Sequence, residues 1–145
     1  MTVADPARYG EAAGSTRSAG WWRWLIVSAY LAFIFFLSAQ STLPALPGEP
    51  SDKLEHATAY SVLGALVVWA AVRGDWRRVT WRTVVGVTVF CVLYGWSDEI
   101  HQRFVPGRHY DLRDLLADGT GAFLAAAASW AWGIIARGRR QTHDM

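Results

Sequence analysis

The sequence predicts an all-α protein, a four-helix transmembrane bundle, on three observations. Hydrophobic residues make up 52% of the 145 residues and charged residues only 18%, below the roughly 25% that soluble domains carry. The apolar residues gather in four runs, each close to the about 20 residues that a helix needs to cross a bilayer. The ionisable residues between the runs collect mostly at one end of the predicted bundle. A functional site is therefore expected at this end.

Four spans follow one another along the chain. We predict them at about residues 21–39, 57–72, 83–96 and 115–136. The second and third runs are shorter than a bilayer requires, so their helices must extend into the polar residues beside them. For the second helix this extension runs toward Asp52.

The segments at the two ends of the chain differ in composition from the spans. Residues 1–20 are small and polar, and we predict a flexible cytoplasmic tail there. Residues 137–145 are predicted to form a basic cytoplasmic tail, which leaves 21–136 as one membrane domain. An alternative for the first run is a cleaved signal peptide, because arginines precede it and residues 39–41 weakly match a cleavage site. The long tail and the many aromatic residues favour a retained span.

The distribution of basic residues predicts the orientation in the membrane. One predicted side carries ten arginines, namely Arg8, Arg17, Arg23, Arg73, Arg77, Arg78, Arg82, Arg137, Arg139 and Arg140. The other side carries four basic residues, namely Lys53, Arg103, Arg108 and Arg113. Because cytoplasmic segments are enriched in Lys and Arg, both termini are expected inside and the loops at 40–51 and 97–114 outside. The polar cluster is then extracytoplasmic.

The first polar segment leads into the second span. Asp52, His56 and Tyr60 are spaced i, i+4 and i+8, so a helix places them on one face. Asp52 with Glu55 is also explained as a helix cap that follows Pro50. His56 and Tyr60 lie one and two turns deeper, where an ionisable residue is costly and is a functional candidate by default.

The second polar segment ends the third span. Glu99 and Gln102 are three residues apart, and we predict them to be the inward-facing pair. Asp98, His101 and Arg103 are interpreted as a solvated helix end at the level of the lipid headgroups.

A predicted turn follows this helix. Pro106 presets its own φ and Gly107 supplies a positive φ, so the chain can fold back there. Such a turn aims Arg108 at the bundle, where its guanidinium suits a carboxylate or a phosphate. The alternative is a lone arginine that contacts lipid headgroups.

The third polar segment opens the fourth span. Asp111, Asp114 and Asp118 share a helix face, and Asp111 is interpreted as the N-cap. Asp114 could serve either the helix dipole or the site. Asp118 lies deeper, so it needs a partner, and we expect Arg108 or Lys53 to provide it.

Together these segments resemble the VanZ-like family over about residues 25–135. The matching motifs are DKLEHATAY at 52–60, YGWSDEIHQRFVPGR at 94–108 and DLLADGTG at 114–121, with a modest departure at Gly119-Thr120. The resemblance implies a bacterial cytoplasmic-membrane protein of four helices, in a family associated with teicoplanin-type glycopeptide resistance. It marks as ligand-binding the positions Asp52, Lys53, His56, Tyr60, Glu99, Gln102, Arg108, Asp114 and Asp118.

Three functions are compatible with this pattern. The favoured hypothesis is a binding or accessory protein that engages a membrane lipid, a cell-wall precursor or a lipophilic glycopeptide through the outward pocket. The alternative is an intramembrane enzyme on a lipid-linked phosphate or ester, with His56 or Glu99 as the catalytic base. A small transporter is less favoured, because the polar residues avoid the midplane of the membrane.

Partners and cofactors are constrained by what the sequence lacks. The net charge is only +2 and the arginines flank apolar runs, so nucleic acid is not an expected partner. The sequence contains no metalloprotease, P-loop or nucleophile-elbow motif, so no cofactor is expected. An alternative is a divalent metal held by Glu99, Asp114, Asp118 and His56. A homo-oligomer is compatible with the sequence.

Overall fold

The computed structural model describes residues 20–41, 52–108 and 110–141, and these residues form four α-helices and no strand. The helices are α1 (Trp22–Ser38), α2 (Asp52–Ala71), α3 (Trp81–Gln102) and α4 (Leu112–Gln141), with the short 3-10 helix η2 (Trp76–Arg78) after α2. The prediction of an all-α, four-helix protein is confirmed. Most of the predicted amino-terminal tail and of the loop at 40–51 lies outside the described residues.

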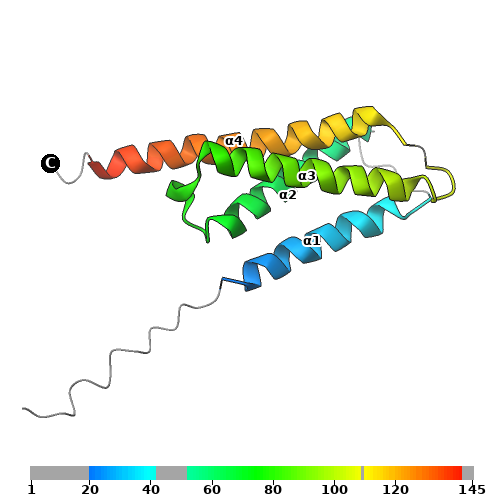
Figure 1. Ribbon diagram of the computed structural model, residues 1–145, viewed down its shortest axis with the longest axis horizontal. Coiled ribbons are helices and arrows are strands. Elements are labelled where there is room, and N and C mark those ends of the chain that lie inside the picture. The colour runs from blue at the N-terminus through cyan, green and yellow to red at the C-terminus, as the bar shows by residue number, and fades with distance from the viewer. Residues whose placement is uncertain (1–19, 42–51, 109, 142–145) are drawn as a thin grey trace, which may run out of the picture.

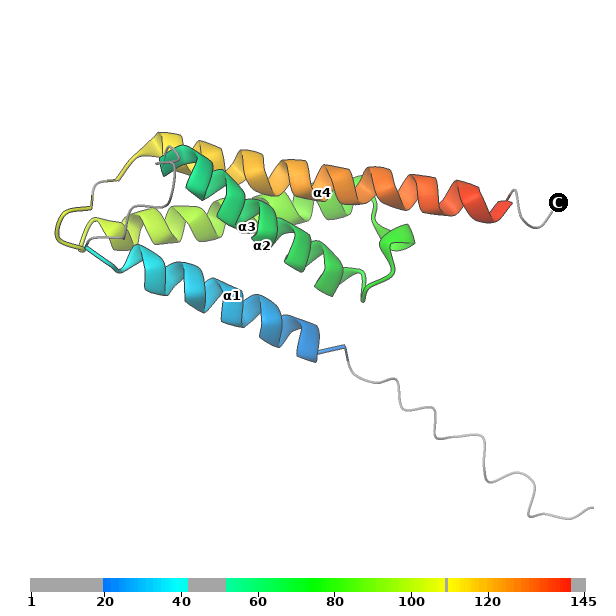
Figure 2. The same cartoon turned by 180° about the vertical axis from the view of Figure 1, so that it is seen from behind.

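The helices run alternately in opposite directions, as Figure 1 shows. The ends of α1 and α3 therefore lie at the same end of the bundle as the beginnings of α2 and α4. α4 packs along both α2 and α3, whereas α1 lies at the edge of the bundle and contacts mainly α2 (Figure 2). The three polar segments consequently meet at one end, which we call the acidic end.

Three helices are long and apolar enough to cross a membrane, namely α2, α3 and the part of α4 from Leu112 to Arg139. The apolar helix α1 has 17 residues, at the lower limit for a span. α3 continues to Gln102 and α4 begins at Leu112, so both helices extend into the polar motifs as the short apolar runs required. α4 also continues to Gln141, so residues 137–141 of the predicted basic tail are helical.

The closest helix packing joins α2 to α4 through small residues. A Cβ added at Gly121 would collide with the carbonyl oxygen of Ala57, and one added at Gly64 would lie 3.0 Å from the backbone of Ala122. The Ser61 hydroxyl donates to the carbonyl oxygens of Ala57 (2.7 Å) and Gly121 (3.1 Å). Small residues let membrane helices approach closely, and here they fix α2 against α4.

The opposite end of the bundle carries most of the described arginines, whereas Arg103, Arg108 and Arg113 lie at the acidic end. The turn between α2 and α3 is held by Asp75, which accepts from Arg77 Nε at 2.9 Å, and this hydrogen bond lowers the pKa of the Asp75 carboxyl. The Arg137 guanidinium of α4 donates to the carbonyl oxygens of Arg77 and Val79. Charges are thus separated along the bundle, while the side that faces the cytoplasm remains a prediction.

Candidate functional site

The acidic end buries four carboxylates. Asp98, Glu99, Asp114 and Asp118 are each between 1% and 5% exposed. Because a buried carboxylate is costly without a charged or hydrogen-bonding partner, the contacts of these four side chains define the site.

Asp118 of α4 pairs with His56 of α2. Asp118 Oδ1 lies 2.9 Å from His56 Nδ1, and His56 Nε2 lies 4.0 Å from Oδ1 of Asp52. Gly95 of α3 makes room for this pair, because a Cβ there would lie 2.6 Å from Asp118 Oδ2. The expectation that Arg108 or Lys53 would pair with Asp118 is therefore wrong, and the deeper His56 takes that place.

Lys53 binds the outer part of the same helix face. Its Nζ lies 3.3 Å from Asp114 Oδ1 and 3.5 Å from Asp111 Oδ2. Asp111 Oδ1 accepts from the backbone N–H of Arg113 at 2.8 Å, which confirms Asp111 as the cap of α4. This hydrogen bond and the ammonium of Lys53 lower the pKa of the Asp111 carboxyl.

Asp98 is buried rather than solvated, so the interpretation of this residue as part of a hydrated helix end is wrong. It accepts from the Ser38 hydroxyl of α1 at 2.6 Å and from Gln102 Nε2 at 3.3 Å. Gln102 is thus paired with Asp98 and not with Glu99. The i, i+4 spacing of Asp98 and Gln102 allows this contact, but the apolar run around Ser38 gives no sign of it.

Glu99 lies beneath the α3–α4 connection. Its Oε2 accepts from the backbone N–H of Asp111 at 3.1 Å. Its Oε1 is buried without a hydrogen-bond partner among the described residues. The hydrogen bond between Glu99 and the backbone of Asp111 ties the end of α3 to the start of α4.

The two other residues assigned to the hydrated helix end behave differently. His101 is half-buried, and its ring packs on Phe35 of α1 with the ring centres 4.4 Å apart. It is therefore a contact between helices rather than a hydrated residue. Arg103 is exposed, and its guanidinium lies 4.5 Å from the ring centre of Tyr110.

Arg108 follows the turn that the sequence predicts. Gly107 has φ of 83°, and the backbone N–H of Arg108 donates to Val105 at 3.1 Å. Arg108 Nε donates to the carbonyl oxygen of Gln40 at 3.1 Å. Among the described residues no carboxylate pairs with this guanidinium, so neither Asp114 nor Asp118 is its partner.

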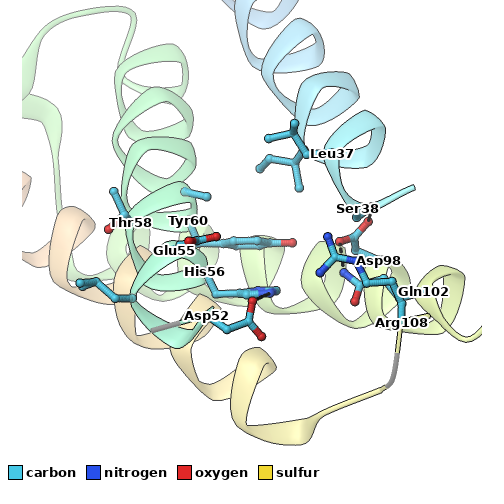
Figure 3. Close-up of a pocket in the computed structure, with 13 residues that line it drawn as sticks. Leu37, Ser38, Asp52, Glu55, His56, Thr58, Tyr60, Asp98, Gln102 and Arg108 are labelled. Atoms are coloured by element: carbon cyan, nitrogen blue, oxygen red, sulfur yellow. Dashed lines mark hydrogen bonds and ion pairs between the residues drawn. The ribbon is translucent and has the colours of Figure 1, made fainter. Parts of the chain in front are cut away.

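A cavity of about 410 Å³ lies between α1 and α2, with residues of α3 and Arg108 at its polar end (Figure 3). Its apolar wall includes Ile34, Leu37, Leu54 and Ala59, and its polar residues are Ser38, Asp52, Glu55, His56, Thr58, Tyr60, Asp98, Gln102 and Arg108. Five of the nine predicted ligand-binding residues line it, namely Asp52, His56, Tyr60, Gln102 and Arg108.

The other four predicted residues, Lys53, Glu99, Asp114 and Asp118, do not line this cavity. Three of them hold α2 against α4, since Asp118 is bonded to the cavity residue His56 and Lys53 of α2 is paired with Asp114 of α4. The role of all nine in ligand binding stays a prediction. The sequence interpretation missed the cavity residues Ser38 and Asp98.

Tyr60 contributes a polar group that no described residue satisfies. The residue is 2% exposed, and its hydroxyl has no hydrogen-bond partner among the described residues. Figure 3 shows the ring extending from α2 across the cavity, with the hydroxyl toward Asp98 and Arg108. A buried hydroxyl costs free energy unless it is hydrogen-bonded, so it is available to a bound molecule.

Three residues of the acidic end are close enough to hold a cation. Ligand atoms of Asp52, His56 and Asp114 lie within 4.8 Å of one another. This set differs from the predicted one, because Asp118 is bonded to His56 Nδ1 and leaves Nε2 as the nitrogen toward Asp52. The Lys53 ammonium already provides Asp114 with a positive charge at 3.3 Å.

Comparisons with known proteins place these features in a family. Neither the curated proteins nor the solved structures give a match to this chain. A family model described as VanZ/LLP1 matches residues 21–134, which cover α1, α2, α3 and most of α4 together with all three polar segments. The chain is a multi-pass membrane protein and belongs to the VanZ/LLP1 family.

Proposed function

We propose that this protein binds an amphiphilic molecule of the bacterial cell envelope in the cavity between α1 and α2. The observation that carries the proposal is the division of the cavity into an apolar wall and a polar end. Ligand pockets typically combine an apolar lining with a few convergent polar groups. A lipid tail would lie along the apolar wall, while a headgroup would reach the polar end.

The polar end offers groups of both kinds to such a headgroup. Arg108 has nitrogen donors beyond the Nε that bonds Gln40, and Tyr60 has a free hydroxyl among the described residues. Asp52 and Glu55 offer carboxylates at the start of α2. A membrane lipid, a lipid-linked cell-wall precursor and a lipophilic glycopeptide all share this combination of apolar tail and polar head.

The sidedness of the proposal rests on the arginines. Most of the arginines that the structure describes belong to the end opposite the cavity, where α2 and α4 end and α1 and α3 begin, and cytoplasmic segments are enriched in arginine. The cavity would then open at the extracytoplasmic leaflet of the cytoplasmic membrane.

Blocking the cavity tests binding directly. Thr58 is exposed and lines the cavity, whereas Val62, one turn further along α2, is exposed but does not line it. We expect Thr58→Trp to weaken binding of a radiolabelled phospholipid to the purified protein at least about tenfold, or about 1.4 kcal/mol, because the indole occupies the site. Val62→Trp should bind like the wild type. Equal binding by both variants would contradict the proposal.

A second candidate function is hydrolysis of a lipid-linked phosphate or ester. The observation that favours it is the His56–Asp118 pair, in which the carboxylate orients the ring and leaves Nε2 toward Asp52, another residue that lines the cavity. A histidine held in this way can act as a general base toward water. Glu99, the other predicted base, does not line the cavity, so His56 is the better candidate.

Loss of this base has a measurable consequence. If the protein hydrolyses a polyprenyl phosphate or a phospholipid ester, His56→Gln should lower the rate by about 10²–10⁴-fold, the usual contribution of a general base. Release of phosphate or fatty acid would be measured in detergent micelles, with His101→Gln as the control. Absence of product from the wild-type protein would remove this candidate.

A further inference from the structure

Several charged side chains that line the cavity have no close ion-pair partner of opposite charge among the described residues. Arg108 has no carboxylate partner among the described residues. Glu55 has no basic partner there either, and the nearest basic group to Asp52 is His56 Nε2 at 4.0 Å, the limit of an ion pair. His56 is itself bonded to Asp118 at 2.9 Å. The cavity therefore presents one unpaired guanidinium and two weakly paired carboxylates.

Asp98 also lines the cavity, but its carboxylate already has hydrogen-bond partners within the protein. Both of its carboxylate oxygens are already used, Oδ1 by the Ser38 hydroxyl and Oδ2 by Gln102 Nε2. The carboxylates available to a ligand are therefore those of Asp52 and Glu55, which are both on the first turn of α2.

The Tyr60 hydroxyl identifies where a bound acceptor would lie. It is buried without a partner in the described part of the chain, and it extends across the cavity toward Arg108 (Figure 3). A phenol hydroxyl and a guanidinium are both hydrogen-bond donors, and such donors suit the oxygens of a phosphate. Arg108 and Tyr60 therefore indicate where a phosphate would bind, while Asp52 and Glu55 lie on the first turn of α2.

We propose that the headgroup bound here is zwitterionic, with a phosphate held by Arg108 and Tyr60 and a protonated amine held by Asp52 and Glu55. This inference rests on the proposed function and specifies its ligand class. A purely anionic headgroup would satisfy Arg108 but would meet the two carboxylates, and like charges in an interface disfavour the wrong partner. A phosphoethanolamine lipid has both required groups and an apolar tail for the other wall.

The test compares lipids that differ only in the headgroup. Purified full-length protein in a neutral detergent is given phosphatidylethanolamine or phosphatidylglycerol with identical acyl chains, and bound lipid is measured by native mass spectrometry. We expect the ethanolamine lipid to bind about five- to tenfold more tightly, because only this lipid can pair its amine with the carboxylates. Soluble glycerophosphoethanolamine should bind much more weakly than the lipid. Equal affinity would show instead that the ligand is a free headgroup and would overturn the lipid assignment.

Two sets of variants separate the two halves of the headgroup. Asp52→Asn with Glu55→Gln should bring the ratio of the two affinities close to one, whereas Asp111→Asn, outside the cavity, should leave the ratio unchanged. Arg108→Gln should weaken both lipids by a similar factor of about ten. Arg113→Gln, an exposed arginine at the same end, should weaken neither.

The outcomes distinguish this inference from the proposed function. If the wild-type protein binds both lipids equally, the zwitterion inference fails, while the Thr58→Trp result still decides whether the cavity binds lipid. If neither lipid binds, the zwitterion inference fails, and binding of a cell-wall precursor or a glycopeptide then decides the proposed function. The substituted acids are exposed or half-buried, and the replacements keep their shape, so a melting curve of each variant is a sufficient check of folding.

Discussion

Gly121→Ala should lower the free energy of unfolding by about 3 kcal/mol, the upper part of the usual range for overpacked cores. The added Cβ would collide with the carbonyl oxygen of Ala57, far inside the 3.0 Å that real Cβ atoms respect. No side chain can rotate to relieve a contact with backbone, so α2 and α4 must separate. The Ser61 hydroxyl, which bonds both helices, would lose its geometry.

The matched control for this prediction is Gly86→Ala on α3. Apart from the backbone of α3 itself, no atom lies within 4 Å of a Cβ placed there, and alanine favours a helix over glycine by about 0.5–1 kcal/mol. The same chemical change should therefore be neutral or stabilising. Both variants would be unfolded by titration with a denaturing detergent and followed by circular dichroism. A wild-type midpoint for Gly121→Ala would refute the close α2–α4 contact.

His56→Leu should destabilise the protein by about 3 kcal/mol, because it leaves the buried Asp118 carboxylate without its hydrogen-bond partner. Asp118 is 1% exposed, and His56 is the partner that its carboxylate contacts at 2.9 Å. The substitution leaves that carboxylate buried without a basic partner among the described residues. The same detergent titration measures the loss.

A double-mutant cycle shows whether the loss belongs to the pair. Combining His56→Leu with Asp118→Asn removes the charge that the first substitution leaves unpaired. The combined loss should be smaller than the sum of the two single losses by about 1–3 kcal/mol, as expected for residues in contact. His101→Leu is the control, since that ring packs on Phe35 and the histidine ion pairs among the described residues all involve His56. Strict additivity would mean that the His56–Asp118 contact contributes no stability.

Much of the site follows from spacing along helices. The i, i+4 and i, i+3 patterns place His56, Tyr60, Asp114 and Asp118 on inward faces, and burial confirms this for Tyr60, Asp114 and Asp118. The cap at Asp111 and the positive φ at Gly107 were also predictable, because both depend on residues close in sequence.

The pairing of charges was not predictable in the same way. α2 and α4 run in the same direction (Figure 1), so the outer Lys53 meets Asp114 and the deeper His56 meets Asp118. A shift of one turn between the helices would instead bring Lys53 beside Asp118 or His56 beside Asp114. The register is set by the close approach of Gly121 to Ala57, a contact 64 positions apart in the sequence.

The sequence by itself determined the class of protein, the helices and the end at which the ionisable residues collect, because hydrophobicity and helical period are local properties. Only the tertiary structure decided which residues form the cavity. Ser38 reaches Asp98 from the end of a mostly apolar helix, and Arg108 lies beside Gln40 rather than a carboxylate. These contacts depend on the rotation and register of α1 against α2 and α3, and that geometry is fixed by packing between distant segments.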